Sequence, residues 1–360
     1  MRTVHNAGGG GVDKRWTSRF WAMRTSSSCL AWCAMIAVSL LLISCGKTER
    51  SGSPERPRAV CTTGIVADLV RNLAGERVEV VAIMGDGVDP HLYKPSPGDV
   101  RLLESGSIIF ANGLHLEGRM IDSIEGMKRE GPGARRVVLV GETIDAKKLL
   151  HAGEGEEKAA DPHVWFDVSL WADAGGAVTA ELTKLDPAGG EVYQRRSAEY
   201  QARLGALHAW VKEQIATIPP ERRVLVTAHD AFGYFGRAYG LEVLAVQGVS
   251  TDSEAGISDI NRLVDRIVGA KIPAVFFESS VPQKAVRAVI EGCQAKGHTV
   301  RVGGELFSDA LGAAGTSEGT YVGVVVHNTR TIVTALGGRF TPFETVAPTA
   351  APGVREGGQP

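Results

Sequence analysis

One apolar stripe limits what this chain can fold into more than any other feature of its sequence. Asp186 followed by Pro187 is typical of a helix N-cap and first helical position, and the helix can continue until Pro219 and Pro220. The intervening apolar residues recur at helical spacing and form one face, which comprises Tyr193, Tyr200, Leu204, Leu207, Val211 and Ile215. At about 1.5 Å per residue this helix is roughly 40 Å long. It is either a long surface helix or a spine that joins two lobes.

Strand and helix patterns alternate on both sides of this predicted helix. Short β-branched runs, each followed by a helical pattern, predict strands at 59–63, 78–84, 107–111, 136–140, 223–227, 241–246, 274–277 and 299–302. Such alternation is typical of mostly parallel sheets covered on both faces. The second half opens with the same strand, helix, glycine and strand order as the first, which is a weak internal repeat.

The sequence therefore predicts an α/β fold of two similar, doubly wound lobes with mostly parallel sheets. We expect an N-terminal lobe at 58–186, one long rigid linking helix at 187–218 and a C-terminal lobe at 219–340. Ligands of such sheets bind beyond the carboxyl ends of the strands. Two facing lobes would form a cleft at that position, and we expect the functional site in this interlobe cleft.

The first 44 residues have the features of a lipoprotein signal peptide. Basic residues precede an apolar run from Cys29 to Ile43, which is shorter than a typical membrane-spanning helix. Ser44 before Cys45 resembles a bacterial lipobox, so we expect cleavage before Cys45 and lipid on its thiol; the alternative is an uncleaved anchor helix. Residues 45–57 are expected to be a tether, and residues 341–360 a disordered tail.

Charge and cysteine content argue against nucleic-acid binding and against a thiolate metal site. The net charge of −2 gives no large basic field, so we expect no nucleic-acid partner. Cys61 falls on a predicted strand and Cys293 on a late helix, so we expect two buried thiols rather than a disulfide. The sequence has no CxxC motif, which argues against a thiolate metal site.

Three histidines and one aspartate follow apolar runs in a way that favours a shared site. His91 lies between Pro90 and Pro95 in GVDPHLYKPSP, a loop that would hold an imidazole at a fixed angle. His163 lies in DPHVW, and His229 follows the strand pattern of VLVTAHDAF. Asp309 is the candidate fourth member. Each histidine alone is more often a structural hydrogen-bonding residue than a ligand, and only the joint placement favours a site.

Imidazole nitrogen and carboxylate oxygen suit Zn²⁺, Mn²⁺, Fe²⁺ or Co²⁺, whereas Ca²⁺ and Mg²⁺ prefer shells of oxygen alone. Zn²⁺ binds such a site more tightly than Mn²⁺, although availability can select manganese. Glu278 follows a predicted strand and is either a ligand or, as we prefer, an acceptor that orients a ligand ring. Weaker candidates for that orienting role are Asp167, Asp230 and Asp252. We expect His115 to pack beside the cleft.

Seven motifs then resemble one known family. In chain order they are GVDPHLYKPSP, NGLHLEGRM, DPHVWFDVSLW, VLVTAHDAFGYF, QGVSTDSEA, FFESSVPQK and GELFSDALGAAGTSEGTYVGVVVHNT. Together they resemble the cluster A-I solute-binding proteins of metal ABC transporters, most closely the treponemal zinc/manganese-binding branch. The resemblance extends from Val60 to Leu336.

The resemblance implies metal ligands at His91, His163, His229 and Asp309. It also implies a monomeric, lipid-anchored extracytoplasmic protein that is not an enzyme and that delivers Zn²⁺, or alternatively Mn²⁺, to a membrane ABC permease. The manganese-type streptococcal members have Glu where this chain has His229, which favours zinc or mixed specificity. The acidic loop at 151–162 departs from the long His-rich loop of the zinc-uptake members.

Three other functions are open on the sequence. A zinc-dependent hydrolase would have a water in place of Asp309, and a second alternative is an adhesin-type surface lipoprotein. The third is a binder of an organic ligand, which needs a roomy aromatic cleft, whereas aromatic residues make up only 6% of this chain.

Overall fold

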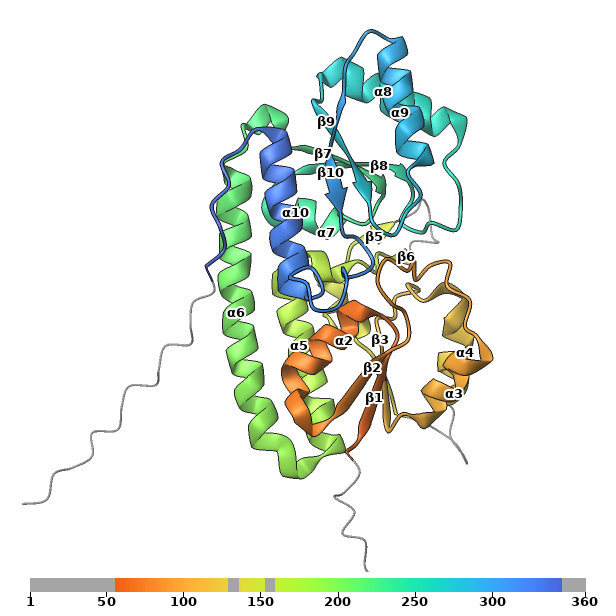
Figure 1. Ribbon diagram of the computed structural model, residues 1–360, viewed down its shortest axis with the longest axis vertical. Helices are drawn as coiled ribbons and strands as arrows, with labels where there is room; N and C mark the ends of the chain where they lie inside the picture. Colours follow the sequence, from red (N-terminus) through yellow and green to blue (C-terminus); the bar gives the residue numbers. More distant parts are fainter. Residues whose placement is uncertain (1–55, 129–135, 153–158, 345–360) are drawn as a thin grey trace, which may run out of the picture. The chain divides into compact units, whose positions relative to one another are not determined.

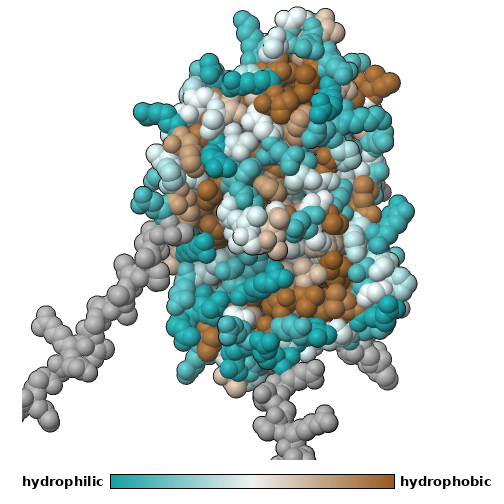
Figure 2. All heavy atoms as spheres, viewed as in Figure 1, coloured by the Kyte–Doolittle hydropathy of each residue, from teal (hydrophilic) through white to brown (hydrophobic). Residues whose placement is uncertain are grey.

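The computed structural model describes residues 56–128, 136–152 and 159–344. The expected signal peptide, Cys45 and nearly all of the tether lie outside this part of the chain. No helix within it has the length and apolarity that a membrane span requires. Hydrophilic residues and scattered apolar patches alternate over the face shown in Figure 2.

The first lobe is built on four parallel strands in the order β2-β1-β3-β4. The strands are β1 (Arg58–Cys61), β2 (Glu79–Ala82), β3 (Ile108–Ala111) and β4 (Val137–Leu139). The lobe's helices are α2 (Gly64–Ala74), α3 (Pro97–Ser105), α4 (Ile121–Lys128) and α5 (Val168–Leu185). Alternate residues of β1 face opposite sides, because side chains alternate along a strand. Ala59 and Cys61 pack in the core with α2 and α5, whereas Val60 packs with Leu103 of α3, so helices cover both faces (Figure 1).

The second lobe contains two parallel pairs, β7 with β8 and β9 with β10. The strands are β7 (Val224–His229), β8 (Glu242–Gln247), β9 (Ala274–Glu278) and β10 (Arg301–Leu306). The helices are α7 (Gly233–Tyr239), α8 (Ile257–Ala270), α9 (Lys284–Ala295) and α10 (Tyr321–Leu336). β7 lies beside β9, which brings the two pairs together. In the described residues the only antiparallel pair is β5 (His151–Ala152) with β6 (Ala159–Ala160). The predicted α/β class with mostly parallel sheets is confirmed.

The long helix α6 (Gly190–Ala216) is the spine that the apolar stripe predicts. All six stripe residues are buried. α6 packs against α2 and α5 of the first lobe and also against α10 of the second, as Figure 1 shows. A helix that only covered one surface would not contact both lobes. The surface-helix alternative is therefore wrong.

The helical run begins at Pro187 with Asp186 at the N-cap position, as the Asp-Pro pair predicts, but its first turn is a 3-10 turn. Residues Pro187–Gly189 form a short 3-10 turn, and the α-helix begins at Gly190. The Asp186 carboxylate makes its strongest contacts with the side chains of the first lobe and of α6 rather than with the helix backbone. Its carboxylate accepts hydrogen bonds at 2.7 Å from Arg77 Nε and from the Tyr193 hydroxyl. Asp186 thus connects the N-terminal end of α6 to Arg77 of the first lobe.

The expected disorder from residue 341 is wrong for residues 341–344, which lie along α6. The backbone N–H of Thr341 donates to Gln214 Oε1 at 2.7 Å, and Trp210 Nε1 donates to the Thr341 carbonyl at 3.1 Å. The rings of Phe340 and Phe343 contact Trp210, with centroids 5.9 and 5.3 Å away. These ring contacts hold the start of the tail on α6, although the tail as a whole is rich in Pro, Gly and Ala. Cys61 and Cys293 are buried free thiols, as expected.

We predict that Trp210→Ala lowers the free energy of unfolding by about 1–2 kcal/mol, because it removes a half-buried ring and the hydrogen bond to Thr341. Urea denaturation of the metal-free protein measures this change. The matched control is Glu199→Ala, an exposed position on the same helix, for which we expect a change within about 0.5 kcal/mol. Equal effects of the two substitutions would contradict the role of this anchor.

Candidate metal centre

The structure brings all four predicted ligand residues together. His91 lies in the loop between β2 and α3, His229 ends β7, and Asp309 lies between β10 and α10. His163 directly precedes a 3-10 turn that leads into α5. All four side chains are at most 2% exposed. Their potential ligand atoms lie within 4.8 Å of one another.

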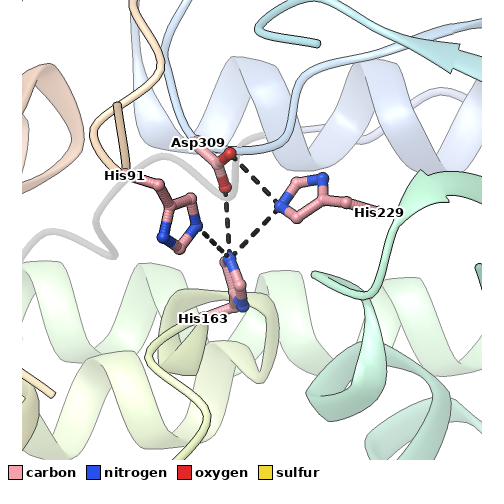
Figure 3. Close-up of side chains that lie close together, drawn as sticks. All are labelled: His91, His163, His229 and Asp309. Atoms are coloured by element: carbon pink, nitrogen blue, oxygen red, sulfur yellow. Dashed lines mark hydrogen bonds and ion pairs between the residues drawn. The ribbon is translucent and has the colours of Figure 1, made fainter. Parts of the chain in front are cut away.

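The donor atoms are spaced as a small cation requires. Nε2 of His163 lies 3.3 Å from Nε2 of His91 and 3.4 Å from Nε2 of His229. Asp309 places Oδ1 3.4 Å from His163 Nε2 and Oδ2 3.3 Å from His229 Nε2, as Figure 3 shows. In a tetrahedral shell with bonds of about 2.1 Å, neighbouring donors lie about 3.4 Å apart. These four separations match that value, and all the potential ligand atoms lie within 4.8 Å of one another.

Two of the three imidazoles are oriented by carboxylates behind them. Nδ1 of His163 donates to Asp161 Oδ1 at 2.8 Å, and Nδ1 of His229 donates to Glu278 Oε2 at 2.6 Å. Each carboxylate also accepts the backbone N–H of its histidine at 2.9 Å. With the proton held on Nδ1, the Nε2 lone pair points to the centre and is available to a metal. Glu278 therefore lies where an orienting acceptor is expected, behind a ring.

The charges of these four side chains compensate one another. Burial opposes a charge on His163, but its hydrogen bonds to Asp161 and Asp309 prevail and raise its pKa to about 9. Burial is likewise outweighed at His229, where Glu278 and Asp309 raise the pKa well above its usual value. Burial would raise the pKa of Asp309, but His229 and His163 hold it well below its usual range. Oδ1 of Asp309 is buried, and its contact with His163 Nε2 at 3.4 Å is at the long limit of a hydrogen bond. A divalent cation fits this set of donors.

His91 differs from the other two histidines. Desolvation by burial lowers its pKa to about 4, against the opposing charge of Asp309. His91 is therefore neutral at physiological pH, which leaves its nitrogen free to bind a metal.

Other sequence candidates lie elsewhere. His115 is exposed, with a backbone φ of 65°, so the expectation that it packs beside the cleft is wrong. Asp167 caps α5 by accepting the backbone N–H of Ser169 at 3.0 Å, and Asp252 is exposed. Asp230 is partly buried, with no hydrogen bond to an imidazole in the described residues.

Asp161 is the residue that the sequence reasoning missed. A repeated tripeptide could have found it, because Asp-Pro-His occurs at 89–91 and again at 161–163. In both copies the aspartate accepts the backbone N–H of the histidine two residues later at 2.9 Å. Only in the second copy does it also contact the ring.

Comparison with known proteins identifies the family. A family model described as ZnuA, "Zinc-uptake complex component A periplasmic", matches residues 59–335. The chain belongs to this family. It is 50% identical over 296 residues to the zinc-binding protein TroA of Treponema pallidum, covering 81% of this chain and 94% of that protein. It is 44% identical over 304 residues to the manganese-binding lipoprotein MntA of Bacillus subtilis, and the match covers 84% of this chain and 97% of that protein.

Solved structures agree with the fold. The periplasmic zinc-binding protein TroA of Treponema pallidum superposes with a TM-score of 0.74, covering 78% of this chain and 99% of that one, at 50% identity. Fe(III)-bound YtgA of Chlamydia trachomatis superposes with a TM-score of 0.70, covering 79% and 100%, at 26% identity. The resemblance drawn from the seven motifs is confirmed.

We predict that metal binding at pH 7.5 releases protons. At that pH the metal-free protein holds protons on His163 and His229, which a metal must displace from Nε2. Affinity should therefore rise with pH between 5 and 8, by about one to two decades per pH unit. Calorimetric Zn²⁺ titrations in buffers of different ionisation enthalpy measure the protons released. A binding enthalpy independent of the buffer would contradict the prediction.

Proposed function

We propose that this chain is an extracytoplasmic binding protein that captures Zn²⁺ or Mn²⁺ and delivers it to the permease of an ABC transporter. One observation carries the proposal: three imidazole Nε2 atoms and a carboxylate converge within 4.8 Å in a buried position. Family membership supports it, since the family is described as a zinc-uptake complex component and the two relatives are named as a zinc-binding protein and a manganese-binding lipoprotein. We propose as ligands His91, His163, His229 and Asp309.

Zinc is the metal that this centre favours. Three nitrogens and one carboxylate at tetrahedral spacing are a donor set that Zn²⁺ accepts without distortion. Mn²⁺ prefers more oxygen ligands and a larger coordination number. The relatives differ in this respect, because TroA is named for zinc and MntA for manganese. Manganese therefore remains the alternative cargo.

The geometry argues against the other functions. A hydrolytic zinc site keeps one position open for water, whereas here Asp309 supplies a fourth protein donor, with its oxygens facing the nitrogens of His163 and His229. An organic ligand needs a roomy cleft, and these four side chains are at most 2% exposed. An adhesion role would not account for a buried cation centre.

The remaining assignments belong to the same proposal. We propose a lipid on Cys45, a monomeric protein held at the outer face of the membrane, and the lobe boundaries 58–186, 187–218 and 219–340. α6 is a single helix of 27 residues that packs against helices of both lobes. We therefore propose that the lobes rock slightly about α6 instead of closing like a wide hinge.

The rocking motion predicts nearly superimposable small-angle scattering curves for the metal-free and the Zn²⁺-loaded protein. α6 prevents a large change in the angle between the lobes. A clear decrease in the radius of gyration on addition of Zn²⁺ would exclude this model.

We predict that His229→Ala lowers Zn²⁺ affinity by several kcal/mol, because it removes one of four ligands and leaves Glu278 without its partner. His115→Ala is the matched control and should bind like the unaltered protein, since His115 is exposed. Competition of Zn²⁺ and Mn²⁺ against a chromophoric chelator measures both affinities and their ratio. Unchanged Zn²⁺ binding by His229→Ala would refute the assignment of the centre.

A further inference from the structure

The loop that carries His91 is held in a different way from the segments that carry the other two histidines. Asp161 and Glu278 each contact the ring of the histidine that they support. The described residues offer no such carboxylate to the ring of His91. Its position must instead be fixed through its backbone. The contacts of the His91 main chain therefore position this residue.

Two contacts fix this backbone on either side. The N–H of His91 donates to Asp89 Oδ1 at 2.9 Å. The carbonyl oxygen of His91 lies against Gly118, where a Cβ would come within 2.5 Å of it. Gly118 belongs to the first lobe, and its lack of a side chain lets the carbonyl group of His91 pack closely against it. The backbone of His91 is thus held by Asp89 at its N–H and packs against Gly118 at its carbonyl oxygen.

Asp89 also contacts the second lobe. Its other oxygen, Oδ2, accepts a hydrogen bond from the hydroxyl of Thr251 at 2.7 Å. Thr251 lies in the loop between β8 and α8 and is only 8% exposed. A single carboxylate thus joins the backbone of a ligand residue to the opposite lobe. A hydrogen bond to an ionised carboxylate is stronger than one between two neutral groups. The bond from Thr251 to Asp89 therefore holds the two loops together more strongly than a neutral hydrogen bond would.

We propose that Asp89 and Thr251 form an interlobe latch that positions His91 and controls metal release. The inference rests on the proposed function. While the lobes are together, Thr251 holds Asp89, and Asp89 holds the backbone of His91 against Gly118. When the lobes separate, the bond to Thr251 breaks and Asp89 loses its second anchor. His91, whose ring has no carboxylate behind it, is then the first ligand to leave the metal.

The latch makes a specific prediction about the rate of release. Thr251→Val keeps the shape of the side chain and removes only the hydroxyl. We expect the Zn²⁺ dissociation rate constant to rise about tenfold, measured by stopped flow after mixing the Zn²⁺-loaded full chain with excess chelator at concentrations where the rate no longer depends on chelator. The absorption spectrum of the Co²⁺-loaded variant should stay unchanged, because all four ligands still bind. Thr251→Ser, which restores the hydroxyl, should release Zn²⁺ at the original rate.

Two further variants keep the test decisive. Asp89→Asn retains the acceptor for the N–H of His91 but weakens the link to Thr251, so its release rate should lie between those of the unaltered protein and Thr251→Val. Thr183→Val is the matched control, because that hydroxyl donates locally to the Thr179 carbonyl on α5. The control should release Zn²⁺ at the unaltered rate. Urea midpoints of the metal-free variants show whether each variant is folded. If Thr251→Val is not folded, the release rate of Asp89→Asn decides whether the latch exists.

The outcomes separate this inference from the proposed function. If the unaltered chain does not bind Zn²⁺ or Mn²⁺, the proposed function fails. If it binds Zn²⁺ but Thr251→Val and Asp89→Asn both release it at the original rate, only the latch is refuted. A rate increase of the same size in Thr183→Val would also refute the latch, because the effect would then not depend on the bond between the lobes.

Discussion

The structure depends on bringing four electron-rich donors together where water cannot reach them. Three imidazole nitrogens and a carboxylate within 4.8 Å are unfavourable unless a cation or protons lie between them. Without a metal, protons on His163 and His229 offset the repulsion between these donors, because the neighbouring carboxylates raise the pKa values of both histidines. A divalent metal would replace those protons. Much of the surrounding architecture serves to keep the donors aligned for that exchange.

The alignment comes from parallel sheets and from one helix. Parallel strands end at the same edge of a sheet, so the loops that follow them collect side chains from distant parts of the sequence. Here the two lobes face each other at these ends, and α6 packs against both. A rigid connector limits how far the lobes can separate. Release of the metal must then depend on small movements, which makes individual contacts between the lobes, such as that of Asp89 with Thr251, important for its rate.

Each histidine receives a different kind of support. Carboxylates hold the rings of His163 and His229 from behind, whereas His91 is held through its backbone. The same Asp-Pro-His tripeptide is used in both ways. In one copy the aspartate turns towards the ring, and in the other it reaches the opposite lobe. Local sequence sets the turn around each histidine, but the surroundings decide what else each aspartate contacts: Oδ1 of Asp161 also accepts from the ring of His163, whereas Oδ2 of Asp89 accepts from Thr251.

The sequence by itself determined the α/β class, the long helix and the four residues of the centre. These follow from local patterns, because hydrophobic periodicity fixes the elements and strand order fixes which loops share an edge. The seven motifs added the family. Tertiary structure alone decided the link between Asp89 and Thr251 and the exposure of His115. It also showed that Asp186 binds Arg77 and that residues 341–344 lie on α6. All of these depend on contacts between residues distant in sequence or on backbone direction, which periodicity does not encode.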